Sequence, residues 1–144
     1  MARIEKSIEI KAPSEKIWPM IQWERSPEWY APFHTVEHKS KQRGVGEIVH
    51  ISGEVAGMKA KWDAETTEQV VNEKAVWRSV GGDFTGFGSQ VLSPTKTGTK
   101  LTMMMEYELP YSVLGKLIDK LRVSKALEKS FDVGLKKLKD MLET

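Results

Sequence analysis

The stretch SVLGKLIDKLRVSKALEKSFDVGLKKLKDMLE, from Ser112 to Glu143, decides the fold of this chain. Apolar side chains recur in it at steps of three or four residues, with one longer gap, which is the spacing of one stripe along an α-helix. A continuous helix over this range would be about 48 Å long. Because one side of so long a helix is apolar, it needs a broad partner surface, and the strand-rich remainder of the chain predicts a β-sheet as that partner. The residues of the stripe are Leu114, Leu117, Leu121, Leu127, Phe131, Leu135, Leu138 and Leu142.

The residues before this helix are predicted to form strands joined by short turns. A first strand precedes the helix-start signal Ala12-Pro13-Ser14-Glu15, and Pro19 keeps that helix short or kinked. The segment Trp23–Phe33, which has two prolines and four aromatic residues, is predicted to be a second short helix or a loop. Short glycine- and asparagine-containing turns favour an antiparallel meander for the strands. The predicted strands cover residues 4–10, 35–40, 46–53, 58–70, 75–80, 84–93 and 100–109.

Length and composition predict one soluble domain over residues 1–144, without a linker. The 22 basic and 20 acidic residues give a net charge of +2 at pH 7 and are spread along the chain, which argues against a nucleic-acid-binding protein. No window has the apolar length of a membrane span, and the N-terminal MARIEKSIEI lacks the apolar run of a signal peptide. The absence of cysteine excludes disulfides and thiolate chemistry. We therefore expect a cytoplasmic protein, a monomer or a weak dimer, without integral membrane association.

The inward faces of the predicted strands combine large aromatic rings, alanines and methionines. Methionine is adaptable and recurs at surfaces that accept varied apolar ligands. This composition fits two interpretations, a plain core that needs flexible side chains to fill gaps and the wall of a cavity. The inward set is Met58, Ala60, Trp62, Ala64, Trp77, Met103, Met105 and Tyr107.

The order of these elements resembles the helix-grip fold of the START-like superfamily, also called SRPBCC, which includes polyketide cyclase/dehydrase-like and lipid-transport-like proteins. The resemblance covers essentially the whole chain, from a first strand through two short helices and a strand meander to a long C-terminal helix. The local motifs that carry it are Ala12-Pro13-Ser14-Glu15-Lys16-Ile17-Trp18, Trp29, Gly44-Val45-Gly46, Gly98-Thr99-Lys100-Leu101-Thr102 with Tyr107 and Pro110, and Leu135-Lys136-Lys137-Leu138-Lys139.

This resemblance implies an α+β fold in which a curved antiparallel sheet of about six to seven strands wraps around the C-terminal helix. It also implies a deep, mostly apolar pocket between the two that binds a small hydrophobic ligand such as a lipid, quinone or polyketide. Trp29 and Tyr30 are expected at its entrance, beside the turn that contains Pro110, Ser112 and Gly115. The predicted ligand-binding residues are Trp29, Tyr30, Met58, Trp62, Trp77, Gln90, Met103, Met105, Tyr107, Leu117 and Leu121.

Motifs for metal and nucleophilic chemistry are weak. His34-Thr35-Val36-Glu37-His38 matches a zinc-peptidase pattern, but that chemistry needs both histidines on one face of a helix. In the strand predicted here His34 and His38 would lie about 13 Å apart, too far to share a metal. The serine of Gly86-Phe87-Gly88-Ser89-Gln90 lies inside a strand pattern rather than at a strand-to-helix turn. We therefore predict no metal, no cofactor and no catalytic residue.

Two other functions stay open beside ligand binding. A cyclase or dehydratase would use the same cavity, but Tyr107 and Gln90 could orient a carbonyl or hydroxyl without giving a strong general base. The chain could instead be an interaction module, because one START-like branch activates a chaperone ATPase through protein contact. The basic face of the last helix also leaves open a transient contact with acidic membranes or with a protein partner.

Overall fold

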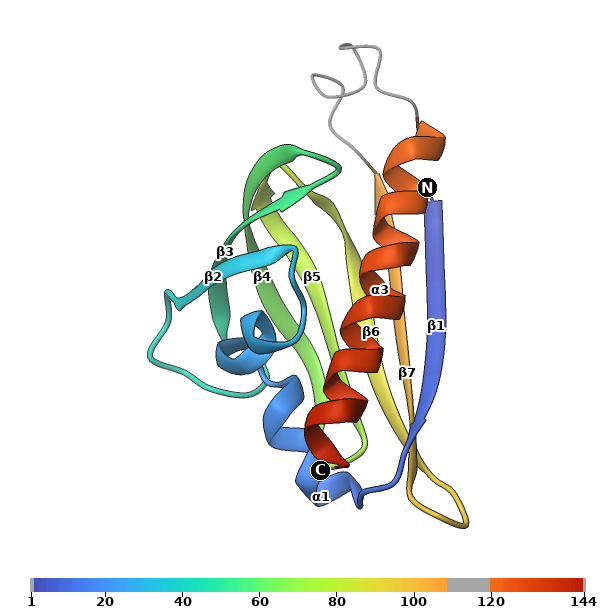
Figure 1. The fold of residues 1–144 in the computed structure, drawn as a ribbon. Coiled ribbons are helices and arrows are strands. Elements are labelled where there is room, and N and C mark those ends of the chain that lie inside the picture. Colours follow the sequence, from blue (N-terminus) through green and yellow to red (C-terminus); the bar gives the residue numbers. More distant parts are fainter. Residues whose placement is uncertain (1, 109–119, 144) are drawn as a thin grey trace.

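The computed structural model describes residues 2–108 and 120–143, which form one curved sheet and four helical segments. Figure 1 shows the long C-terminal helix running beside the sheet, with the short helices packed near its C-terminal end. The helical segments are α1 (Ser14–Ile17), the two 3₁₀ helices η1 (Trp18–Ile21) and η2 (Trp23–Glu28), and α3 (Lys120–Leu142). The strands are β1 (Ala2–Ile10), β2 (Phe33–His38), β3 (Ile48–Val55), β4 (Met58–Val70), β5 (Lys74–Gly82), β6 (Thr85–Pro94) and β7 (Thr99–Glu108).

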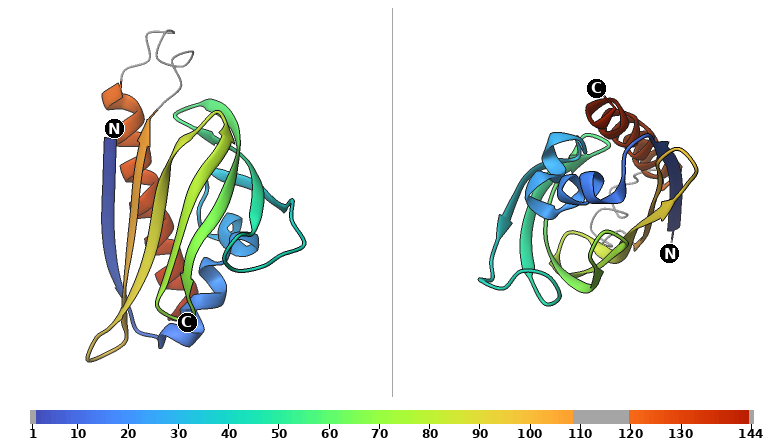
Figure 2. Two further views of the ribbon diagram at one scale, coloured as in Figure 1. Left: turned by 180° about the vertical axis from the view of Figure 1, so that it is seen from behind. Right: turned by 90° about the horizontal axis from the view of Figure 1, so that it is seen from below.

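The seven strands are antiparallel throughout and lie in the order β1-β7-β6-β5-β4-β3-β2. Irregularities in the register after Asp63 and after Thr66 interrupt the pairing of β4 with β5, and such bulges increase the local bend and twist of a strand. Seen from below, the sheet is a trough whose open side is closed by α3 and the short helices (Figure 2). The α+β helix-grip architecture predicted from the sequence is confirmed.

Alternation along each strand determines what faces the trough. On β4, Trp62, Ala64 and Thr66 are buried, as the alternation predicts. On β7, Leu101, Met103, Met105 and Tyr107 are all buried and their neighbours are not. These inward side chains form the walls that meet the helices.

Prolines explain why the first helices are short. Pro13 precedes α1, and α1 ends at Ile17 because Pro19 lacks the N–H that would continue the helix. The indole Nε1 of Trp29 donates to the carbonyl oxygen of Met20 at 2.8 Å, which ties the end of η2 to η1. This bond holds Trp29 and Tyr30 over the open side of the sheet.

Helix α3 presents a buried stripe to the sheet, but the stripe differs from the predicted one at its start. Leu121 is 58% exposed, whereas Val123 is fully buried. Six residues turn a helix by about 600°, so Leu121 lies about 120° around the axis from Leu127, and Val123 lies only about 40° away. The prediction of Leu121 as an inward residue was therefore wrong. The buried residues of the stripe are Val123, Leu127, Phe131, Leu135, Leu138 and Leu142.

The C-terminal end of α3 is fixed to the start of the chain. Lys139 Nζ donates to the backbone oxygen of Glu9 at 2.8 Å, and Glu143 Oε2 accepts from the backbone N–H of Lys11, also at 2.8 Å.

None of the helices in the described ranges has the length and apolar character needed to cross a membrane.

Candidate functional site

The described residues line a cavity of about 250 Å³ that lies between the β3–β4 hairpin, the β5–β6 turn and α3. Its volume is close to the lower end of the range for small-molecule sites. Most of its wall is apolar, and the polar side chains on it come from Lys59, Asp83 and Tyr30. The apolar wall includes Val55, Met58, Trp62, Phe84, Val123 and Leu127.

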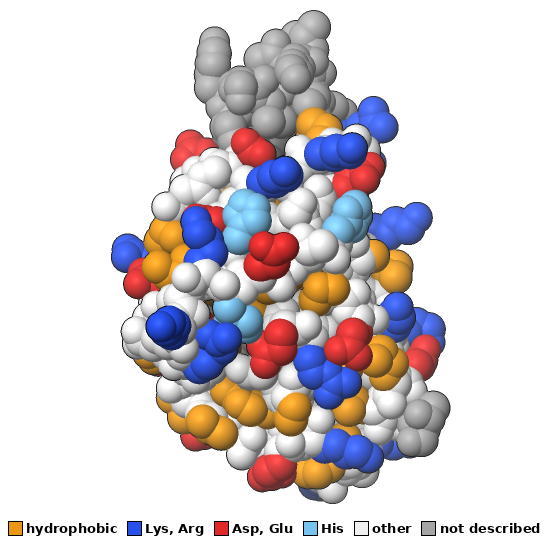
Figure 3. All heavy atoms as spheres, turned by 90° about the vertical axis from the view of Figure 1, so that its left-hand side faces the viewer, with side chains coloured by type: hydrophobic (Ala, Val, Ile, Leu, Met, Phe, Trp, Pro, Cys, Tyr) orange, Lys and Arg blue, Asp and Glu red, His pale blue; other side chains and the backbone are white. Residues whose placement is uncertain are grey.

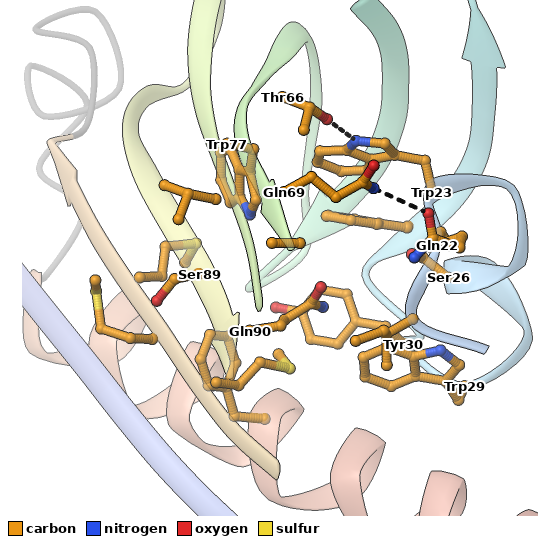
Figure 4. A pocket seen from close by; sticks show the side chains of 18 of the residues that line it. Gln22, Trp23, Ser26, Trp29, Tyr30, Thr66, Gln69, Trp77, Ser89 and Gln90 are labelled. Atoms are coloured by element: carbon orange, nitrogen blue, oxygen red, sulfur yellow. Dashed lines mark hydrogen bonds between the residues drawn. The ribbon is translucent and has the colours of Figure 1, made fainter. Parts of the chain in front are cut away.

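The second space is a cavity of about 60 Å³ between the short helices and the inner face of β4, β5, β6 and β7. Figure 4 shows Trp29 and Tyr30 entering from the helical side, with Trp77, Ser89 and Gln90 coming from the strands opposite. This volume holds a few water molecules or one small polar group. It borders the larger cavity, because Tyr30, Phe33 and Met105 belong to the walls of both.

A continuous set of aromatic rings runs through both walls. The rings of Tyr30 and Phe33 meet edge to face with their centroids 4.8 Å apart, and Phe33 contacts Trp62 at 5.6 Å in the same way. Trp77 contacts Trp23 at 5.7 Å and Phe84 at 5.9 Å. Edge-to-face pairs at these distances are favourable beyond the area that they bury, so the rings form a defined wall rather than a loose filling.

Trp77 can reach the cavity only because of Gly88 on the neighbouring strand. A Cβ atom at position 88 would lie 2.7 Å from the indole carbons of Trp77. Only glycine leaves room for that ring against β6. Gly88 therefore lets Trp77 form part of the cavity wall.

Polar groups gather at the edge of the smaller cavity near η2. Trp23 Nε1 donates to Thr66 Oγ1 at 3.0 Å, and Thr66 Oγ1 donates in turn to Glu47 Oε1 at 3.1 Å. Gln69 Nε2 donates to Gln22 Oε1 at 3.4 Å nearby (Figure 4). Glu47 is only 4% exposed, so a carboxylate forms part of an otherwise uncharged wall.

The two buried tyrosines have different surroundings. Burial raises the pKa of Tyr30, so its hydroxyl stays protonated and can donate to a ligand. Burial also raises the pKa of Tyr107, and hydrogen bonding with the Ser124 side chain of α3 offsets part of that increase. Tyr107 thus faces the helix.

Eight of the eleven predicted ligand-binding residues line the two cavities. Tyr107 lines neither cavity, and its expected role of orienting a ligand is not supported by this position. Leu121 is 58% exposed and lines neither cavity. Leu117 lies outside the described residues, together with the predicted turn that contains Pro110, Ser112 and Gly115. The eight are Trp29, Tyr30, Met58, Trp62, Trp77, Gln90, Met103 and Met105.

Sequence reasoning missed Phe33, Phe84 and Glu47. Glu47 carried a signal, because it lies two residues before Val49 and four before Ile51, both fully buried, and so shares their inward parity. A carboxylate that continues an inward apolar pattern should have been considered as a site residue. Phe33 and Phe84 lie at the very starts of their strands, where parity is a poor guide.

None of the three histidines lines either cavity. His38 lies on the inward side of the sheet with its strand partner Val49, and His50 faces outward. His34 and His38 belong to strand β2, and His38 Nε2 is 3.4 Å from Glu24 Oε2. His50 Nδ1 lies 2.7 Å from Asp63 Oδ1. Across residues 2–108 and 120–143, no group of three His, Cys, Asp or Glu side chains is placed to hold a metal ion.

Comparison with known proteins agrees with this architecture. The sequence profile described as "Polyketide cyclase / dehydrase and lipid transport" matches residues 1–143. An uncharacterized 17.2 kDa protein of Streptomyces lincolnensis is 28% identical over 123 residues, which cover 84% of this chain and 78% of that protein.

Solved structures share the fold at lower identity. The crystal structure of TTHA0849 from Thermus thermophilus superposes with a TM-score of 0.82 at 23% identity and covers 98% of this chain and 97% of that one. The Zhui aromatase/cyclase from Streptomyces sp. R1128 gives a TM-score of 0.79 at 15% identity, with 99% and 93% of the two chains covered. A START superfamily protein from Mycobacterium smegmatis gives 0.77 at 17% identity, with 98% and 97% covered.

A curved antiparallel sheet, a C-terminal helix across its open side and an aromatic-lined cavity between them define a START-like helix-grip protein. The chain belongs to the polyketide cyclase/dehydrase and lipid transport family, whose profile it matches over nearly its whole length.

Proposed function

We propose that this protein binds a small hydrophobic ligand in the space between the sheet and α3. The observation that carries the proposal is the cavity of about 250 Å³ whose wall is mostly apolar. Well-packed protein interiors leave few voids larger than a water molecule, so a space of this size is more than a packing defect. The family description, which names both polyketide chemistry and lipid transport, supports the same class of ligand.

Burial of apolar surface would supply the affinity. A ligand that loses about 200 Å² of apolar surface to the cavity gains about 5 kcal/mol at about 25 cal/mol per Å². The ligand loses translational and rotational freedom and side chains become ordered, and these costs offset part of the gain. The aromatic wall limits that cost, because its rings are already held in place by one another.

Catalysis in the same cavity is the second candidate, favoured by the Glu47 carboxylate on the wall. The fold neighbour described as an aromatase/cyclase makes this a chemically reasonable alternative. Tyr30 is a poor general base, because burial raises its pKa, and no second carboxylate lines the smaller cavity among the described residues. Binding therefore ranks ahead of turnover.

Filling the larger cavity tests the proposal. Ala60 is half-buried on its wall, and Ala60→Phe would occupy the space with an added ring. Val133→Phe is the matched control, since Val133 is 52% exposed on α3. We expect Ala60→Phe to weaken binding of 2-naphthol, followed by titration calorimetry, by about tenfold or more, while the control binds like the wild type. Equal affinity of all three folded proteins would place the bound probe elsewhere and reject the proposal.

Native mass spectrometry of protein purified from its own host gives an independent test. A co-purified apolar molecule that is present in the wild type and lost from Ala60→Phe supports the cavity as its site. A molecule retained by both proteins contradicts that assignment.

A further inference from the structure

Glu47 is held in a fixed position on the wall of the smaller cavity. It follows a turn in which Gly44 and Gly46 have φ angles of +81° and +91°, a conformation that favours glycine. The backbone N–H of Gly46 donates to the carbonyl oxygen of Thr66 at 2.8 Å. The backbone N–H of Thr66 donates to the carbonyl oxygen of Glu47 at 3.0 Å. With the bond from Thr66 Oγ1 to Oε1, both the backbone and one carboxylate oxygen of Glu47 are fixed.

Among the described residues this carboxylate has no cationic partner. None of their ion pairs includes Glu47, and none of the described residues that line the smaller cavity is a lysine, arginine or histidine. A buried carboxylate is costly unless it is paired or hydrogen-bonded. Within the described part of the chain, the hydrogen bonds use Oε1 only, which leaves Oε2 as an acceptor for a group that enters the cavity.

The surroundings of the carboxylate suit a cation. Trp23, Tyr30, Phe33 and Trp77 all line the same cavity, and the faces of aromatic rings attract cationic groups. The polar side chains opposite, Ser89 and Gln90, are neutral and can accept hydrogen bonds (Figure 4). An anionic group in this cavity would be repelled by Glu47, and the described residues of its wall include no basic side chain to offset that repulsion.

We propose that Glu47 binds the polar end of the ligand and that the preferred ligand is an apolar molecule with a protonated amine. The inference rests on the proposed function and narrows its ligand class. The amine lies in the smaller cavity against Glu47, and the apolar body extends toward the larger one across Tyr30, Phe33 and Met105, which border both. A ligand with a neutral hydroxyl should bind less tightly than the amine, and a ligand with a carboxylate should bind least tightly.

Three ligands with one ring system and different polar groups test this order. They are 2-naphthylmethylamine, 2-naphthol and 2-naphthoate, titrated by calorimetry at neutral pH. Hydrogen bonds to charged groups contribute enough for a difference of about tenfold or more, so we expect the amine to bind at least about tenfold more tightly than the carboxylate, with the alcohol between them.

Glu47→Gln removes the charge but keeps an oxygen that can accept from Thr66. In this variant the amine and the carboxylate should bind with affinities within a few fold of each other. The matched control is Glu54→Gln, the same change at an exposed position of β3, which should keep the wild-type order. Melting temperatures establish that each variant is folded, and if Glu47→Gln is not, the wild-type series decides the question alone.

The outcomes separate the two proposals. Equal affinities of the three ligands for the wild type, or a preference for 2-naphthoate, would overturn the role of Glu47 while leaving a hydrophobic binding site. An order that Glu47→Gln leaves unchanged would also overturn it. If none of the three ligands binds the wild type, the proposed function itself fails, and the inference fails with it.

Discussion

Asp63, on the outer face of β4, is held by two basic side chains. Lys39 Nζ lies 2.9 Å from its Oδ2 and His50 Nδ1 lies 2.7 Å from its Oδ1. Two hydrogen bonds lower the pKa of Asp63 below its ordinary value of 3.8. The one from Lys39 has the larger effect, and the one with His50 adds to it. Figure 3 shows one side of the molecule, on which basic and acidic side chains are intermingled rather than gathered into a large patch of one sign.

The lowered pKa predicts how stability depends on pH. Because the folded pKa of Asp63 lies below the unfolded one, its contribution is complete above the unfolded value and is lost as the pH falls through the folded value. Asp63→Asn should therefore cost about 1 kcal/mol of unfolding free energy at neutral pH, and the difference from wild type should shrink at about pH 3. Urea unfolding at both pH values measures this. Glu54→Gln is the control, because Glu54 is exposed and belongs to none of the ion pairs among the described residues, and it should change the unfolding free energy little at either pH. A cost of Asp63→Asn that persists in acid would contradict the prediction.

At the residue scale, sequence reasoning identifies side-chain parity but not what each inward side chain meets. Met103, Met105 and Tyr107 all lie on the inward face of β7 as predicted. The first two line cavities, whereas Tyr107 lies against Ser124 of α3. That division depends on where a distant helix crosses the strand, and local alternation holds no information about the crossing.

At the scale of elements, strong periodic patterns were the best guide. The strand predicted at 58–70 has those bounds in the structure, because its alternation is uninterrupted between two turns. The stripe of α3 was predicted correctly from Leu127 onward. It failed at Leu121, where the gap of six residues already signalled that the stripe passes through a different residue.

The corrected stripe makes a prediction for α3. Leu138 is fully buried against the sheet, and Leu138→Ala should cost about 2–5 kcal/mol, since the change removes packing contacts and leaves a void. Val133 lies on the exposed side of the same helix, and Val133→Ala should change stability by no more than about 0.5 kcal/mol. Denaturant unfolding of both variants measures the difference. Similar losses at the two positions would mean that α3 does not pack on the sheet through this stripe.

At the scale of the whole molecule, the sheet, the short helices and α3 together enclose an interior divided into two cavities. The division is made by side chains, because Tyr30, Phe33 and Met105 border both spaces. The resemblance of the sequence to the START-like superfamily predicted one pocket between sheet and helix. It could not predict the division, which depends on how Tyr30 after η2, Phe33 of β2 and Met105 of β7 meet in space.

This division predicts that ligand size is limited by the narrowing at Tyr30, Phe33 and Met105, where the two cavities meet, and not by their total volume. Met105→Ala should widen this narrowing and cost about 2–5 kcal/mol of stability. It should also raise the affinity for the three-ring phenol 9-phenanthrol relative to 2-naphthol, because the larger ring system needs space from both cavities. Leu101→Ala is the matched control, since Leu101 is fully buried on the same strand but lines neither cavity. It should lose a similar amount of stability without a change in the ratio of the two affinities, measured by calorimetry. If the ratio changes equally in both variants, general loosening of the core sets the size limit, and the narrowing at Met105 does not.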